Sequence, residues 1–157
     1  MLPTLNRPDA AWVNGEKRTL LSVWSIVRSP MLLAGDLESA VADASTLKML
    51  LNPVAAAVHA TGQHVRLVLQ TDTVCVLASE FVLPTGVGGR TSGGATATAV
   101  SVTNLGPNGT APAPITFASL GLQGGSVTDV WSSATVASDQ HGWSVDALWG
   151  SGTSFYY

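Results

Sequence analysis

One segment near the start of the chain, residues 18–52, limits the possible folds more than any other. Residues 18–29 carry apolar side chains at intervals of three and four, which predicts a helix that ends before Pro30. Residues 31–34 form a short apolar run that Gly35 closes, a pattern typical of a strand buried on both faces of a parallel sheet. The segment therefore begins as a helix followed by a buried strand.

A second helix is predicted almost directly after that strand. Apolar residues return to helical spacing over residues 37–51, and Asn52 and Pro53 indicate the end of the helix. A helix, a strand and a helix in this order correspond to one turn of a (β/α)8 barrel, which needs about 250 residues to close. Because the chain has 157 residues, we expect residues 1–53 to be an α/β remnant, the last turn of a TIM barrel.

The remainder of the chain, residues 54–157, has a different pattern. Short runs rich in β-branched and aromatic residues are bounded by glycine, proline, asparagine, aspartate or serine, without helical spacing between them. Several short strands separated by turns are typical of an antiparallel sandwich, so we predict an all-β antiparallel sandwich as a C-terminal domain. Its strands are expected at residues 65–69, 73–78, 98–102, 115–117, 127–131, 143–149 and 153–157.

The composition indicates that this chain packs against more protein. Charged residues make up 11% of it, against about 25% in a typical soluble domain. A membrane location is disfavoured because the longest apolar run, residues 20–37, is interrupted by Arg28, Pro30 and Gly35. The net charge of −3 and the scattered basic residues form no positive stripe, so we expect no nucleic-acid partner.

No cofactor or metal site is predicted. Gly86 and Gly88 begin a G-x-G pattern, but a dinucleotide cradle also needs a strand before it and a helix after it, so a loop is the preferred interpretation. The three histidines and the single cysteine are spread along the chain without the spacing of metal ligands.

One carboxylate, Asp36, has a position that could carry chemistry. It follows the predicted strand at residues 31–34, at the edge where barrel enzymes keep their catalytic groups. It could equally cap the following helix through the free N–H groups there. We favour the cap, because glycoside hydrolysis needs two carboxylates and no second one can be assigned to a neighbouring strand.

Four tryptophans could bind a sugar by stacking. On an exposed sheet face, their rings would make the chain a free-standing carbohydrate-binding or interaction module. The preferred interpretation is that they fill the sandwich core or its contact with another domain, as strand aromatics commonly do. These residues are Trp12, Trp131, Trp143 and Trp149.

The order of motifs in the chain resembles family-27 glycoside hydrolases, the α-galactosidase and α-N-acetylgalactosaminidase group. Residues 19–52 contain Leu-x-x-Trp-Ser-Ile, Arg-Ser-Pro, Met-Leu-Leu-Ala-Gly-Asp-Leu and Leu-Leu-Asn. They resemble the seventh helix, eighth strand and eighth helix of that family's catalytic barrel. Residues 54–58 resemble its exit segment, and residues 99–106 and 117–131 resemble strands of its C-terminal β-sandwich.

The resemblance also says where the family's chemistry is expected. Met1, Leu2 and Pro3 resemble the tail of a motif at the seventh barrel strand, whose methionine lines the sugar pocket, which implies Met1 as a substrate-binding residue. The two catalytic aspartates of the family belong to the fourth and sixth strands, both upstream.

The resemblance therefore implies a fragment without activity of its own. The intact enzyme would be a retaining hydrolase of terminal α-galactosides, and this chain is predicted inactive alone because it lacks both catalytic carboxylates. Its expected partner is the missing N-terminal barrel portion, and the α-galactoside substrate would bind only in the intact enzyme. Intact relatives are often secreted or lysosomal, but no signal peptide opens this chain, so the compartment stays open.

Overall fold

The computed structural model describes residues 14–32, 38, 42–87, 94–107, 115–137, 141–143, 145 and 153–157. Most of the regular structure in this part is antiparallel sheet. Its helices are α1 (Asn14–Val27), α3 (Ala44–Leu50), α4 (Pro53–Thr61) and the short 3-10 turn η2 (Ala118–Leu120). Its strands are β1 (Gln63–Gln70), β2 (Val74–Val82), β3 (Thr96–Asn104), β4 (Ile115–Thr116), β5 (Val127–Thr128), β6 (Thr135–Ala137), β7 (Gly142–Trp143) and β8 (Thr153–Tyr156).

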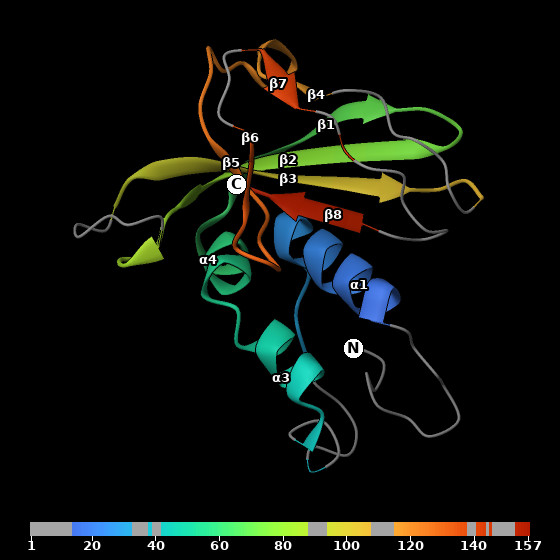
Figure 1. Ribbon diagram of the computed structural model, residues 1–157, viewed down its shortest axis with the longest axis vertical. Coiled ribbons are helices and arrows are strands. Elements are labelled where there is room, and N and C mark those ends of the chain that lie inside the picture. The colour runs from blue at the N-terminus through green and yellow to red at the C-terminus, as the bar shows by residue number, and fades with distance from the viewer. Residues whose placement is uncertain are drawn as a thin grey trace.

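The central element is a four-stranded antiparallel sheet with the order β1-β2-β3-β8 (Figure 1). Strands β2 and β3 pair without a register shift from Val74↔Asn104 to Val82↔Thr96. Strand β1 forms one edge and pairs less regularly, with two register shifts. Two small sheets, β4-β7 and β5-β6, complete the β-structure.

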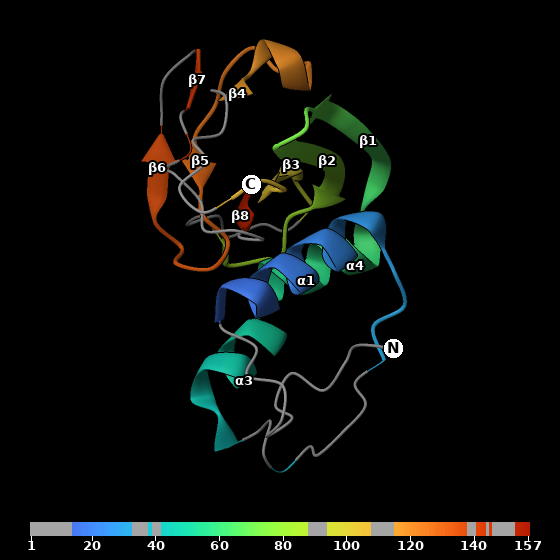
Figure 2. The ribbon, with the colours of Figure 1, turned by 90° about the vertical axis from the view of Figure 1, so that its right-hand side faces the viewer.

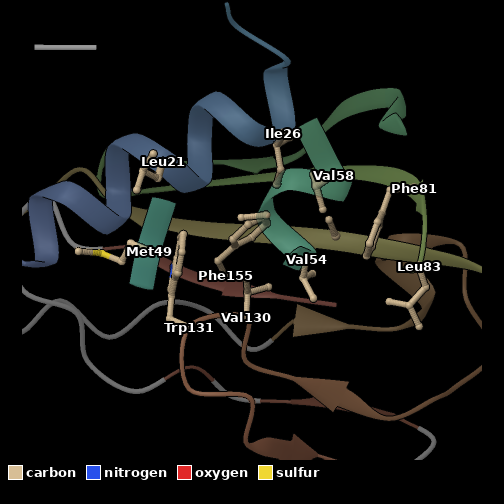
Figure 3. Packing of buried hydrophobic residues seen from close by; sticks show 12 residues of the cluster. Leu21, Ile26, Met49, Val54, Val58, Phe81, Leu83, Val130, Trp131 and Phe155 are labelled. Carbon is tan, nitrogen blue, oxygen red and sulfur yellow. The ribbon is translucent and has the colours of Figure 1, made fainter. Parts of the chain in front are cut away.

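The central sheet is covered on both faces, as Figures 1 and 2 show. Because neighbouring side chains of a strand point to opposite faces, alternate residues of β2 and β3 enter two different cores. On one face, α1 and α4 pack against Phe81, Ala99 and Phe155 (Figure 3). On the other face, the small sheets and η2 cover Val76 and Val102. The helices thus share a core with the sheet.

The first helix agrees with the predicted one but begins earlier, at Asn14. It ends at Val27, and Arg28 then has a left-handed backbone (φ 53°) ahead of Pro30. The Arg28 guanidinium donates to the carbonyls of His59 (3.0 Å) and Gly62 (3.3 Å), at the end of α4. These bonds satisfy carbonyls that a helix end leaves unpaired, and they hold the ends of α1 and α4 together.

The single helix predicted over residues 37–51 is wrong. Asp43 has an extended backbone (φ −84°, ψ 97°), and α3 begins after it at Ala44. The Asp43 side chain accepts from the backbone N–H groups of Ser45 and Thr46. An aspartate that bonds the next backbone groups competes with helix continuation, so the apolar spacing continues through a break in the helix.

The expectation of an all-β part from residue 54 onward also needs correction, because α4 occupies Pro53–Thr61. Asn52 caps this helix, and Pro53 stands at its first turn, where proline is favoured because its missing N–H has no helical partner. Residues 54–58, the segment that resembles the family's exit, lie within α4. Asn52 and Pro53 therefore end one helix and also start the next.

Most predicted strands are confirmed. Strands β1 and β3 contain those expected at residues 65–69 and 98–102, and β2 contains all but Thr73 of the one expected at residues 73–78. The strand expected at residues 127–131 is shorter than predicted, and β6 was not predicted. Met31 and Leu32, the described part of the expected barrel strand, lie outside any strand. The division of the chain at residues 53 and 54 stays a prediction.

Candidate functional site

The predicted site residues fall into two groups. Met1 and Asp36 lie outside the described residues, as do Trp12 and Trp149. Their suggested roles in substrate binding, helix capping and sugar stacking therefore stay predictions. Trp131 and Trp143 are described, and their surroundings bear on the stacking hypothesis.

Trp131 is buried where the helices meet the sheet (Figure 3). Only 8% of it is exposed, and its ring centroid lies 5.9 Å from that of Phe155. Its indole Nε1 donates to the Ser22 hydroxyl of α1 at 3.2 Å, and Ser22 is itself fully buried. A ring enclosed by protein cannot offer its face to a sugar. The hydrogen bond to Ser22 instead makes Trp131 a link between α1 and the sheet.

Trp143 is buried in the other core, on the opposite face of the sheet. It is 7% exposed, and its ring lies 5.8 Å from Phe117 and 5.5 Å from Tyr156. Trp131 and Trp143 therefore belong to separate cores and form no common platform. The preferred interpretation, that these tryptophans fill the core, is confirmed for both.

Asn52 makes a second link between the helices and the β-structure. Its Oδ1 accepts from the backbone N–H groups of Val54 and Ala55, each at 3.0 Å, which caps α4. Its Nδ2 donates to the Val130 carbonyl at 2.8 Å, 78 positions away. We call Ser22, Asn52, Val130 and Trp131 the helix–turn seam, because their bonds tie α1 and α4 to the turn after β5.

The carboxylate of Asp43 is held by protein donors. Its Oδ2 accepts from the Lys17 Nζ at 3.0 Å and from the Thr46 hydroxyl at 2.6 Å. Lys17 is buried on α1, so the pair connects α1 with the start of α3. The hydrogen bonds from Thr46, Lys17 and Ser45 lower the pKa of Asp43 far below its usual range.

The Asp43 bonds predict a pH-dependent stability. The folded carboxylate has a lower pKa than the unfolded one, so its contribution is complete above about pH 4 and is lost progressively as the pH falls. Asp43→Asn keeps the helix cap but removes the charge, and should cost about 1–3 kcal/mol at neutral pH. Urea unfolding from pH 7 to pH 2 should show less loss of stability on acidification in this variant than in the wild type. Parallel loss in both proteins would contradict the assignment.

The other carboxylates with described contacts are also engaged. Glu80 lies 3.2 Å from His64 and 4.0 Å from Arg66 on an exposed surface. Asp129 accepts from the Ser132 N–H at 2.6 Å. Within the described ranges, no three side chains of the metal-binding types gather, and none of the helices has the length and apolarity needed to cross a bilayer.

The fold matches part of several solved enzymes. The family-27 β-L-arabinopyranosidase of Geobacillus stearothermophilus aligns with 93% of this chain at a TM-score of 0.76 and 21% identity. A Bacillus halodurans C-125 protein assigned as an α-N-acetylgalactosaminidase aligns with 93% at 0.73 and 17% identity. Mortierella vinacea α-galactosidase I aligns with 99% at 0.72 and 14% identity. No protein-family model and no curated protein matches the sequence.

The matched regions are only a part of those enzymes. This chain spans 30%, 31% and 38% of the three structures, in the same order. The coverage agrees with the resemblance found in the sequence, because both match nearly the whole chain to one part of a longer enzyme. The chain has the fold of the C-terminal part of family-27 glycoside hydrolases.

Proposed function

We propose that this chain acts as the C-terminal part of a family-27-type glycoside hydrolase and has no hydrolytic activity by itself. The observation that carries the proposal is the share of each chain that the structural alignments cover. The chain aligns over 93% of its length with enzymes of which it spans about 30%. A barrel portion would then supply both catalytic aspartates, and this chain would complete the barrel and support it with a β-sheet domain.

The described side chains support a structural role for this part of the enzyme. Retaining hydrolysis needs two carboxyl groups about 5 Å apart that face one sugar. Asp43 instead caps α3 and binds Lys17, and Asp129 binds the turn at Ser132. The burial of Trp131 and Trp143 argues against the alternative, a free-standing module that stacks sugars on an exposed sheet face.

We infer that the barrel portion would pack against the helix side of the chain. Near the helix ends, Leu51 is 69% exposed, Leu32 is 62% exposed and Val27 is 43% exposed. These exposed aliphatic side chains are available for an apolar contact with another protein. The low content of charged residues, 11%, agrees with a chain that has a large contact area.

Assays of the purified chain and of a complemented chain test the proposal. We expect no release of nitrophenol from nitrophenyl α-D-galactopyranoside or β-L-arabinopyranoside by the 157-residue chain. Hydrolysis above the buffer rate would contradict the proposal. The barrel portion of the Geobacillus enzyme, co-expressed with this chain, should form a complex that hydrolyses the arabinopyranoside.

Two matched variants test the docking side in the same assay. Leu51→Asp should abolish complementation, because it places a charge in the apolar contact. Val136→Asp, at an aliphatic residue of β6 that is 49% exposed, should leave complementation intact. Equal effects of the two changes, or no complex at all, would contradict the proposed contact.

The sugar specificity is a property of the barrel in this proposal. The three matched enzymes are named for arabinopyranoside, N-acetylgalactosaminide and galactoside hydrolysis, yet they share the fold of this part. A chain that supports the barrel is compatible with each of these substrates. Complementation should therefore restore the specificity of the barrel that is supplied.

A further inference from the structure

The helix α3 is short and lies at a distance from the main sheet. Figures 1 and 2 both show it farther from the four-stranded sheet than α1 and α4. It has seven residues, and isolated helices shorter than about 12–15 residues are only marginally stable in water. The stability of α3 therefore depends on its contacts with the rest of the chain.

These contacts come mainly from two buried side chains of α3. Met49 is 7% exposed and belongs to the core on the helix side of the sheet, and Leu50 packs against the same core while it is only partly buried. Thr46 is fully buried, and its hydroxyl accepts from the Lys17 Nζ at 2.8 Å. One apolar and one polar residue thus hold α3. The helix α4 instead has three buried apolar residues, Val54, Ala55 and Val58.

The polar cluster between α1 and α3 contains a buried ammonium group. Lys17 is 5% exposed, and its Nζ donates to the Asp43 carboxylate as well as to Thr46. Asp43 in turn caps α3, because its side chain accepts from the backbone N–H groups of Ser45 and Thr46. A buried charge is costly unless it is paired, so the cluster is stable only while its members are together. We therefore expect α3 to separate from α1 in one step.

Asn52 separates α3 from α4. Its backbone is extended (φ −65°, ψ 117°) between the two helices. Its side chain bonds the backbone of Val54, Ala55 and Val130, and none of these groups belongs to α3. Opening of α3 would therefore leave the cap of α4 and its bond to the β-structure intact.

The position of Leu51 depends on α3. Its backbone N–H donates to the Leu47 carbonyl at 3.0 Å, in the last turn of the helix, and its side chain is 69% exposed. Leu51 is one of the residues that the barrel portion would contact under the proposed function. A partner that needs Leu51 in this position binds the chain with α3 folded, and a ligand that prefers one of two states shifts the population toward it.

We propose that α3 is a conformational switch of this chain. It opens and refolds against α1 while α4 and the sheet stay folded, and the barrel portion binds the chain only when α3 is folded. The second part rests on the proposed function. Formation of the complex would then suppress the opening of α3, so docking and the ordering of this helix are coupled.

Hydrogen exchange of the full chain, measured by NMR at low urea concentrations, tests the opening. The reporters for α3 are the amides of Leu47 and Leu51, which donate to the carbonyls of Asp43 and Leu47. They should be at least about 100-fold less protected than the amides of β2 and β3, with a smaller urea dependence because local opening exposes less surface. The Ala56 amide of α4 should follow the sheet. Equal protection in α3 and the sheet, or in Leu51 and Ala56, would overturn the proposal.

Two substitutions on α1 that each remove one positive charge are matched variants. Lys17→Met keeps an unbranched side chain but removes the donor to Asp43 and Thr46, and should lower the protection of the α3 amides about tenfold. Arg18→Met, at the exposed neighbouring residue, should change this protection by less than about twofold. Equal effects of the two substitutions would overturn the role of the polar cluster.

The co-expressed complex with the barrel portion tests the coupling. Exchange at Leu47 and Leu51 should be at least about tenfold slower in the complex than in the free chain, because a partner that binds only the folded form stabilises it by mass action. A complex that leaves the exchange of α3 unchanged would overturn the coupling and keep the proposed function. Failure to form any complex would overturn both, whereas the free chain alone decides whether α3 opens by itself.

Discussion

Trp131→Ala should lower the free energy of unfolding by about 3–5 kcal/mol, the range for loss of a large aromatic side chain from a core. The ring is 8% exposed and packs against Phe155, and Figure 3 shows it between the helices and the sheet. Removal would leave a cavity and also leave the buried Ser22 hydroxyl without the Nε1 donor. Single domains are stable by about 5–15 kcal/mol, so the loss would be a large fraction of the total. Urea unfolding followed by circular dichroism measures it.

Trp131→Phe is the matched control for this prediction. It keeps most of the buried ring and removes the hydrogen bond to Ser22, so its cost should be smaller, about 1–2 kcal/mol. Equal costs for the Ala and Phe variants would show that the hydrogen bond, and not the packing, dominates. A cost below about 1 kcal/mol for Trp131→Ala would contradict the anchoring role altogether.

The anchoring of the helices matters for the proposed function. Leu51, which would contact a barrel portion, is the chain neighbour of Asn52 in the helix–turn seam, and Leu32 follows α1, which the seam connects to the β-structure. A complex with the barrel needs these side chains at fixed positions. We therefore expect Trp131→Ala to reduce complementation of the barrel portion as well as stability.

The sheet could be predicted from the sequence because its strands have a local pattern. Along β2 and β3, small and β-branched residues alternate between the two cores, and turn residues bound each run. The sequence predicts too long a strand at β5 and no strand at β6, because each of these short strands depends on its partner for stability. Their pairing has a register shift and covers few residues, so the local pattern is weak.

The helix boundaries are harder to predict from the sequence than the strands, because the capping residues and the apolar spacing indicate different helix ends. Over residues 37–51 the spacing predicts one helix, but the Asp43 carboxylate bonds the next backbone N–H groups and ends it. In the sequence, Asn52 and Pro53 were interpreted only as the end of the helix predicted over residues 37–51. The same two residues are a favourable start, and the alanines of α4 have high helix propensity.

The structural roles of the residues in the motifs that resemble the family could not be predicted from their spacing in the sequence. Asn52 and Val130 are 78 positions apart, and Ser22 and Trp131 are 109 positions apart. No local pattern indicates which distant groups will meet. The structure shows that several residues of the motifs that resemble the family hold the fold together.

Asn52→Ala should lower the free energy of unfolding by about 2–4 kcal/mol. It removes the α4 cap, which is worth about 0.5–2 kcal/mol, and leaves the Val130 carbonyl without its donor, at a cost of about 1–3 kcal/mol. Asn52→Asp separates these contributions, because an aspartate still caps the helix but offers no donor to Val130. The Asp variant should therefore lose only the second contribution, and hydrogen exchange should show faster opening of α4 in the Ala variant than in the Asp variant. If both variants lose equal stability, the cap contributes nothing, and the bond across the seam alone fixes the position of α4.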